Sequence, residues 1–332
     1  MKKKVILILT IIFVILIAGV ILPKPIDNLD ELWNFNFARN IANNLIPYRD
    51  FNMVQTPLLS ILAGLVLKLF GTELFVMRIL AILLSSLILL TVYLILKECK
   101  INKYVIFFAL IGFFMLYKDF LCFDYNFGVL LIILFTIYIE IKNLDKLDFK
   151  NDFLLGILVG TSILIKQTTG LAFSLVYMFY RILNIYDKSK WKNELKRIAF
   201  RAMGALVPII IFSIYLTINH IWYEFIDYTI LGIKTFSNKI LYINLLNGNY
   251  GIIIQILSVV MPITLLYLYF KTVVMKTNTN EDNILFILFA YSVASIVVIY
   301  PISDDMHFLV GILPLRDSVN LYSIYTTYKN AR

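Results

Sequence analysis

The stretch that decides the fold reads "TPLLSILAGLVLKLFG", from Thr56 to Gly71. Thr56 can cap a helix, Pro57 suits the first helical position and Gly71 suits the residue past the end. The helix between them has about 14 residues and a length of roughly 21 Å at 1.5 Å per residue. Because a bilayer core is about 30 Å thick, we expect this helix to lie along the membrane surface, with Lys68 near its end.

The distribution of positive charge favours the same interpretation. If residues 57–70 lie flat, the charged loops 97–103, 143–152, 184–201 and 271–283 all fall on the cytoplasmic side. Cytoplasmic loops of membrane proteins carry an excess of Lys and Arg. A spanning helix at 57–70 would instead place the most basic loop outside. That loop contains Lys188, Lys190, Lys192, Lys196, Arg197 and Arg201.

The composition indicates an integral membrane protein. Of 332 residues, 61% are hydrophobic and only 15% are charged, whereas soluble domains carry about 25% charged residues. We predict one transmembrane domain over residues 1–332, with the lipid bilayer as its main partner. The net charge of +9 is attributed to cytoplasmic loops, and no nucleic-acid partner is predicted.

Apolar runs predict an all-α, polytopic bundle of about nine transmembrane helices. The first, Val5–Leu22, follows "MKKK" and exceeds the usual 7–15-residue signal core, so we expect an uncleaved helix with a cytoplasmic N-terminus. The first outer loop, residues 23–73, holds the amphipathic helices. The remaining apolar runs lie at about 74–96, 104–117, 126–142, 153–165, 168–183, 200–219, 250–270 and 284–300.

Asp30 and Glu31 form an acidic pair in "PKPIDNLDELWNFNFARN", directly after the first span. Residues 29–45 have the pattern of an amphipathic helix. Asn28 could cap it, with Glu31 completing a variant of the capping box, and carboxylates suit a helix start in any case. Successive helical side chains point about 100° apart, so a base at Asp30 supported by Glu31 is easier to build than a shared metal site.

Two further polar groups interrupt apolar sequence on the predicted outer side. "TSILIKQTTG" contains Lys166 and Gln167, and a cation at such a depth has a function, has a partner or reaches back to the interface. "YPISDDMHFLVGILP" contains Asp304, Asp305 and His307. The alternative interpretation of this segment is a solvated turn after a helix.

Several other polar residues have a simpler interpretation. Arg39 reads as a surface group on its helix, and Asp119 and Asp124 read as members of a solvated turn. Glu224 and Asp227, in "WYEFIDYTI", belong to a predicted interfacial segment. Asp50 and Gln55 are minor candidates. Cys99 and Cys122 form neither a CxxC metal motif nor a disulfide framework, and His220 and His307 are too far apart for a zinc motif. No metal ligand or cofactor is predicted, although a divalent metal requirement is left open.

The order of these motifs resembles that of a known family. The first span is followed by "DE", an amphipathic helix, "YRDF", "TPLLSILAGLVLKLFG" and "RILAILLSSLILLTVYLI". This order is similar to that of GT-C glycosyltransferases of the dolichyl-phosphate-mannose–protein mannosyltransferase kind, glycosyltransferase family 39. "GILVGTSILIKQTTGLAF" and "YPISDDMHFLVGILP" resemble later segments of the same family.

The resemblance implies transfer of a hexose or pentose from a polyprenyl-phosphate carrier to an acceptor hydroxyl, on the outer face of the cell membrane and with inversion. Asp30 matches the catalytic acid position of the family and Glu31 its neighbour. Gln55 and Thr56 stand where relatives often have Lys or His, so Lys166 or Arg39 would supply the charge for the donor phosphate. The further donor-binding candidates are Gln55, Gln167, Asp304, Asp305 and His307.

The sequence leaves other functions open. A membrane transporter or lipid flippase is one, although the chain shows no clear internal repeat and its charges lie at the outer edge. An inactive GT-C-like scaffold is another, since relatives usually continue into further spans. The acceptor of the implied enzyme could be a glycan, a lipid or a protein.

Overall fold

The computed structural model describes residues 2–26, 28–144, 146–184, 191–232, 239–247, 250–275 and 279–315. This part of the chain is helical and has no strand beyond two isolated bridges. The helices are α1 (Lys2–Ile21), α2 (Leu29–Ala42), α3 (Leu58–Phe70), α4 (Leu74–Glu98), α5 (Lys103–Tyr117), α6 (Tyr125–Lys142), α7 (Phe149–Ile165), α8 (Gln167–Phe179), α9 (Trp191–Asn219), α10 (Trp222–Ile226), α11 (Ile252–Tyr269) and α12 (Asn280–Ser295). A further helix covers Asp305–Leu315.

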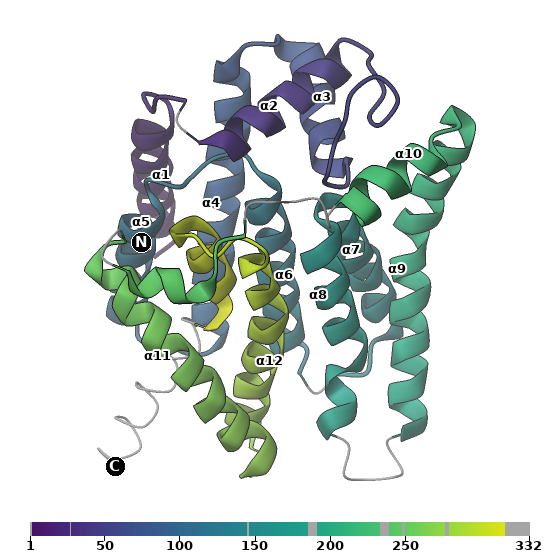
Figure 1. The fold of residues 1–332 in the computed structure, drawn as a ribbon. Coiled ribbons are helices and arrows are strands. Elements are labelled where there is room, and N and C mark those ends of the chain that lie inside the picture. The colour runs from purple at the N-terminus through teal and green to yellow at the C-terminus, as the bar shows by residue number, and fades with distance from the viewer. Residues whose placement is uncertain are drawn as a thin grey trace.

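Helix α3 lies with α2 across the upper end of the bundle, above the long helices (Figure 1). The two pack so closely that a Cβ on Gly64 would meet the carbonyl oxygen of Ala38 at 2.9 Å. Gly71 ends α3 with a φ of 114°, a conformation that glycine adopts at little cost. With 13 residues, α3 is a short helix, as the sequence predicts, and it is separate from the long helices of the bundle. Its placement along the bilayer surface stays a prediction.

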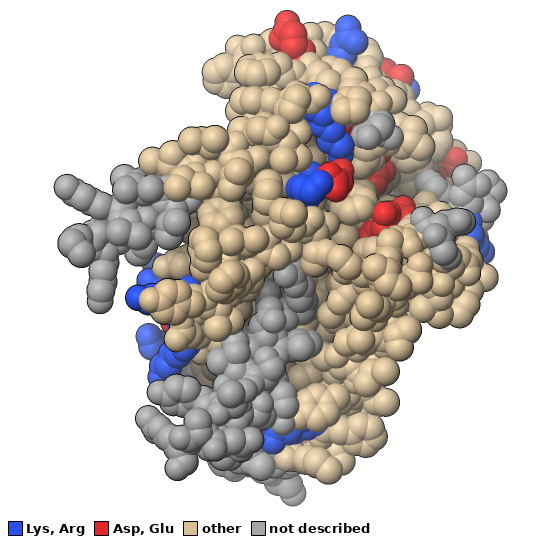
Figure 2. All heavy atoms as spheres, turned by 90° about the vertical axis from the view of Figure 1, so that its left-hand side faces the viewer, with Lys and Arg blue, Asp and Glu red and all other residues tan. Residues whose placement is uncertain are grey.

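The long helices have the length and composition of membrane spans. Helices α4, α6, α9, α11 and α12, the last two with the turns that follow them, are each long and apolar enough to cross a bilayer. Shorter apolar helices cover Ile11–Ile21, Leu58–Phe70, Lys103–Tyr117 and Asp305–Leu315. Figure 2 shows a face that is mostly uncharged, with several charged side chains gathered in its upper part. The protein is an all-α, multi-pass membrane protein.

Helices α7 and α9 touch backbone to backbone. A Cβ on Gly156 would overlap the carbonyl oxygen of Arg201, and one on Gly160 would overlap that of Ala205. Gly204 of α9 likewise leaves no space for a side chain, because a Cβ there would overlap the carbonyl oxygen of Phe153. Small residues allow such close approach between membrane helices, and here they set the separation of the two helices.

Three local predictions need correction. Thr56 does not cap α3, because its hydroxyl donates to the carbonyl oxygen of Ile163 at 2.8 Å and the helix begins at Leu58. Helix α2 ends at Ala42, not at residue 45. The predicted loop 184–201 is helical from Trp191 onward, and two of its basic residues, Arg197 and Arg201, pair with the buried acids Asp152 and Glu140, which no local pattern reveals. Within that loop, Lys188 and Lys190 lie outside the described residues.

Candidate functional site

The acidic pair lies at the start of α2, where its two members face different partners. Asn28 caps the helix by accepting a hydrogen bond from the backbone N–H of Asp30 at 2.8 Å. The predicted capping-box role of Glu31 is not seen; its Oε1 instead pairs with Nε of Arg78 on α4 at 3.3 Å. Asp30 accepts a hydrogen bond from the hydroxyl of Tyr125 at 2.9 Å. Glu31 thus ties α2 to α4, while Asp30 faces α6.

The first turn of α6 presents a second carboxylate. Asp124 caps the helix by accepting from the backbone N–H of Phe127 at 2.9 Å, and its other oxygen accepts from Nδ2 of Asn126 at 3.2 Å. The side chain is fully buried, so the predicted solvated turn is wrong at Asp124. The preceding Asp119 does fit that prediction: it is exposed and pairs with Lys118 at 2.7 Å. The sequence could have shown that Asp124 caps a helix, but it could not show that the side chain is buried, because burial depends on tertiary packing.

Lys166 and Gln167 lie where the chain turns between α7 and α8. Lys166 has an extended backbone, and its ammonium donates to Oδ1 of Asn126 at 2.6 Å and lies 5.3 Å from the ring centre of Tyr125. Gln167 links three segments: its Nε2 donates to the carbonyl oxygens of Val54 at 2.7 Å and of Thr229 at 3.0 Å. Both residues therefore have specific partners within the protein.

The segment after α12 supplies a histidine–aspartate pair. Nδ1 of His307 lies 2.7 Å from Oδ1 of Asp304, which also accepts from the backbone N–H of His307 at 2.8 Å. His307 is buried and Asp304 half-buried, so this part of the segment is not a solvated turn. Asp305 is half-buried and accepts a hydrogen bond from the N–H of Met306 at 3.0 Å.

A small pocket lies among these elements. Its wall combines the segment before α3, the start of α6, the α7–α8 turn and the segment after α12. The lining residues are Val54, Gln55, Tyr125, Lys166, Gln167, Thr168, Tyr300, Pro301, Ile302 and His307. Segments far apart in the sequence thus form one pocket at the upper end of the bundle, and its lining includes the polar side chains of Lys166, Gln167 and His307.

The predicted site residues divide into three groups. Gln55, Lys166, Gln167 and His307 line the pocket itself. Asp30 and Asp304 do not line it, but each contacts a residue that does. Glu31, Arg39 and Asp305 are not among the lining residues; Arg39 is exposed in the last turn of α2. Tyr125 and Asn126, which connect the predicted residues to one another, were not predicted from the sequence.

Burial and neighbouring charges shift the pKa values of three residues at the site: Asp124, Lys166 and Asp304. Burial and the nearby charge of Asp30 raise the pKa of Asp124 to about 7. Burial lowers the pKa of Lys166 to about 8, although the carboxylates of Asp124, Asp30 and Asp304 oppose this shift. For Asp304, burial opposes ionisation, but the hydrogen bonds and charge of His307 outweigh it and lower the pKa. Perturbed ionisation in a pocket is typical of functional sites.

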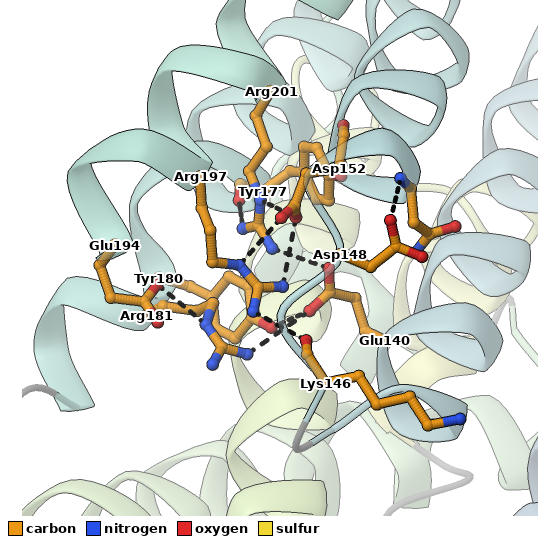
Figure 3. Close-up of polar contacts among 11 residues, drawn as sticks. Glu140, Lys146, Asp148, Asp152, Tyr177, Tyr180, Arg181, Glu194, Arg197 and Arg201 are labelled. Carbon is orange, nitrogen blue, oxygen red and sulfur yellow. Dashed lines mark hydrogen bonds and ion pairs between the residues drawn. The ribbon is translucent and has the colours of Figure 1, made fainter. Parts of the chain in front are cut away.

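A second buried ionic cluster lies at the other end of the bundle, between α6, α7 and α9 (Figure 3). Arg201 is fully buried and bonds Asp152 through Nε at 2.8 Å and Glu140 through Nη2 at 2.9 Å. Arg197 pairs with Asp152 at 3.0 Å. We call this group, together with Tyr180, Arg181 and Glu194, the inner ionic cluster. Arg197 and Arg201 were predicted to lie in a loop; they lie in helix α9 and are buried, while their cytoplasmic side stays a prediction.

No metal cluster appears in the part of the chain that the structure describes. Within it, no group of at least three His, Cys, Asp or Glu side chains could hold a metal ion. No residue is therefore assigned to a metal.

Comparisons with known proteins agree with the fold. The sequence profile of the dolichyl-phosphate-mannose-protein mannosyltransferase family matches residues 54–218. The crystal structure of the Archaeoglobus fulgidus oligosaccharyltransferase, in complex with zinc and sulfate, superposes with a TM-score of 0.51 at 12% identity, covering 96% of this chain and 49% of that chain. The profile match covers just under half of the chain, and both comparisons support a glycosyltransferase of the GT-C type. No curated protein matched the sequence.

The two matches bear differently on the site. The family match includes Gln55, Asp124 and Lys166 but not Asp30 or His307. The structural likeness covers nearly the whole chain and concerns the GT-C fold alone, because the identity is only 12%. This chain also spans about half the length of the oligosaccharyltransferase chain.

Proposed function

We propose that this GT-C protein transfers a sugar from a polyprenyl-phosphate-linked donor to an acceptor hydroxyl at the outer membrane surface. The observation that carries the proposal is the amine of Lys166 at the pocket wall of a GT-C-like bundle, held by Asn126 and the ring of Tyr125 and under the electrostatic influence of the carboxylates of Asp30 and Asp124. A buried cation suits a donor phosphate, and the carboxylates suit the proton of an acceptor.

Asp30 is the proposed general base. As the acceptor oxygen attacks the anomeric carbon, its proton passes to the Asp30 carboxylate. Asp30 lies behind Tyr125 relative to the pocket, and catalytic contacts in unliganded enzymes are often completed only when substrate binds. Glu31 holds α2 against α4 through Arg78 and thereby supports the position of Asp30.

Lys166 is the proposed partner of the leaving group. The bond between the anomeric carbon and the phosphate oxygen breaks, and its electron pair remains on the polyprenyl phosphate. A fixed cation stabilises this developing charge in a site that largely excludes water. His307, held by Asp304 at the same pocket wall, is a second candidate donor to the phosphate. Attack opposite the phosphate inverts the anomeric centre.

The proposal concerns the class of reaction and does not specify the sugar or the acceptor. Both a hexose and a pentose are compatible with the proposal, as are glycan, lipid and protein acceptors. The donor head must reach a pocket at the upper end of the bundle, so we place the reaction on the side opposite the inner ionic cluster. With the predicted cytoplasmic N-terminus, that side is the outer face of the cell membrane.

Release of polyprenyl monophosphate tests the proposal whatever the identity of the acceptor. Purified protein is incubated with synthetic short-chain polyprenyl-phosphate hexoses and pentoses and a cell-envelope extract, and the released lipid phosphate is quantified. We expect Asp30→Asn to lower kcat by roughly 10²–10⁴-fold. Asp119→Asn is the matched control, since Asp119 is an exposed carboxylate outside the pocket.

Two results would overturn the proposal. Release by Asp30→Asn at the wild-type rate would remove Asp30 as the base. Absence of release by the wild-type protein from every hexose and pentose donor would reject the transferase reaction itself.

A further inference from the structure

The first turn of α6 contacts both partners of the proposed reaction. Tyr125 donates its hydroxyl to Asp30, and the next residue, Asn126, accepts from the ammonium of Lys166. Asp124, one residue earlier, caps the helix and also binds Asn126. Three consecutive residues therefore connect the proposed base on α2 with the proposed phosphate-binding cation on the α7–α8 turn.

The amide of Asn126 has two chemically different ends, and both are used. Its Nδ2 can only donate, and it donates to the Asp124 carboxylate at 3.2 Å; its Oδ1 can only accept, and it accepts from Lys166 at 2.6 Å. With its Nδ2 bound to Asp124, the amide must present oxygen to Lys166. The carboxylate thus determines the polarity of the group that holds the ammonium.

The ring of Tyr125 restricts Lys166 on a second side. The ammonium lies 5.3 Å from the ring centre, within the range of a cation–π contact. Tyr125 and Lys166 both line the pocket, whereas Asp124 and Asn126 do not. A cation held by a neutral amide and a ring keeps its charge available, because neither contact neutralises it.

We propose that Asp124 and Asn126 are positioning residues, which hold the Lys166 ammonium at the pocket wall in the place that the donor phosphate requires. The proposal rests on the proposed function of Lys166. Asp124 acts through the orientation of Asn126, and neither residue needs to touch the donor.

Asp124→Asn separates this role from helix capping. Asn is as good a capping residue as Asp, so the bond to the N–H of Phe127 can persist. The new amide nitrogen cannot accept from Asn126, however, and the amide of Asn126 loses its fixed orientation. Asp148→Asn is the matched control, because Asp148 caps α7 through the N–H of Asn151 at 3.0 Å and lies outside the pocket.

The measurement is the binding of a short-chain polyprenyl monophosphate to the full-length protein in detergent. We expect Asp124→Asn and Asn126→Ala each to weaken binding roughly tenfold, with Asp148→Asn unchanged. In a Lys166→Met background, Asp124→Asn should weaken binding no further, because the group that it positions is gone. A purely structural effect would instead persist in that background.

The outcomes distinguish this inference from the proposed function. If Lys166→Met binds the probe as wild type does, Lys166 does not bind phosphate and both proposals lose their basis. If Lys166→Met weakens binding but Asp124→Asn and Asn126→Ala do not, only the positioning role is rejected. A further loss from Asp124→Asn in the Lys166→Met background also rejects it.

Discussion

The two buried ionic clusters of this protein use the same kinds of residue in opposite ways. The inner ionic cluster pairs its acids, Glu140, Asp152 and Glu194, with an equal number of arginines, Arg181, Arg197 and Arg201. The pocket end gathers Asp30, Asp124 and Asp304 around Lys166 and His307. Among the described residues, a pocket with charged lining residues opens at the second group, whereas Arg201 at the centre of the first is fully buried.

The difference is the reason for assigning a stabilising role to the first cluster and the proposed reaction to the second. Arginine forms several directed hydrogen bonds and stays charged at every physiological pH, so the cations of the inner ionic cluster keep their charge. The pocket end has more carboxylates than lysines, with a Lys166 pKa of about 8 and an Asp124 pKa of about 7. Its protonation can therefore change in the range where enzymes work.

Removing the central arginine should produce the largest effect on stability. Arg201→Met leaves Glu140 and partly Asp152 without their buried partner, and breaking such a pair costs about 3–5 kcal/mol. We expect a strong loss of thermal stability in detergent, or no folded protein. Arg181→Met is the comparison: Arg181 is 24% exposed, and Glu140 keeps its pair with Arg201 when Arg181 is removed, so we expect a smaller loss of stability. Equal stabilities for the two variants would contradict the stabilising role.

Removing one hydroxyl at the pocket end should affect the reaction rather than the fold. Tyr125→Phe keeps the ring beside Lys166 but removes the hydrogen bond to Asp30, and a bond to a charged group contributes about 1.5–3 kcal/mol. We expect kcat for release of polyprenyl phosphate to fall by roughly tenfold or more, with little change in binding of the lipid phosphate.

Tyr117→Phe is the matched control for this change. It removes another buried tyrosine hydroxyl, which donates to the carbonyl oxygen of Leu309 at 2.5 Å outside the pocket. If both variants lower kcat equally, the contact between Tyr125 and Asp30 has no special part in the reaction.

The smallest effect that we expect is a dependence on pH of the affinity for a polyprenyl monophosphate. Lys166 binds phosphate as the ammonium, which it loses as the pH rises through its pKa of about 8. Affinity for a polyprenyl monophosphate should therefore fall about tenfold per pH unit above that value. The probe itself is fully ionised there, because its second pKa is about 6. Lys166→Arg should keep its affinity at pH 9, since a guanidinium stays charged.

The predicted loss of affinity at high pH tests whether Lys166 binds the phosphate through its positive charge. If wild-type protein binds the probe equally well at pH 7 and pH 9 while Lys166→Met binds it weakly, the amine acts through its shape and hydrogen bonds rather than its charge.

The fold could be predicted further than the site. Length alone excluded the helix beginning near Pro57 from the long spans, and apolar runs located most of the others to within a few residues. Local patterns could not show that Arg201 meets Glu140, because the two are 61 residues apart. The prediction that Asp124 lies in a solvated turn was wrong for the same reason. Its sequence context is that of any helix cap, and its burial comes from the packing of α2 and the α7–α8 turn against α6.

The close contact of α7 with α9 has a consequence for how proteins of this kind can diverge. At the level of Gly156, Gly160 and Gly204, no side chain larger than hydrogen fits without a shift of backbone. A homologue with a bulkier residue there must carry α9 farther out. The displacement would reach the segment after α10, whose Thr229 accepts a hydrogen bond from Gln167. Substitutions at the contact of α7 with α9, outside the pocket lining, could therefore reshape the rim of the pocket without altering a single polar residue.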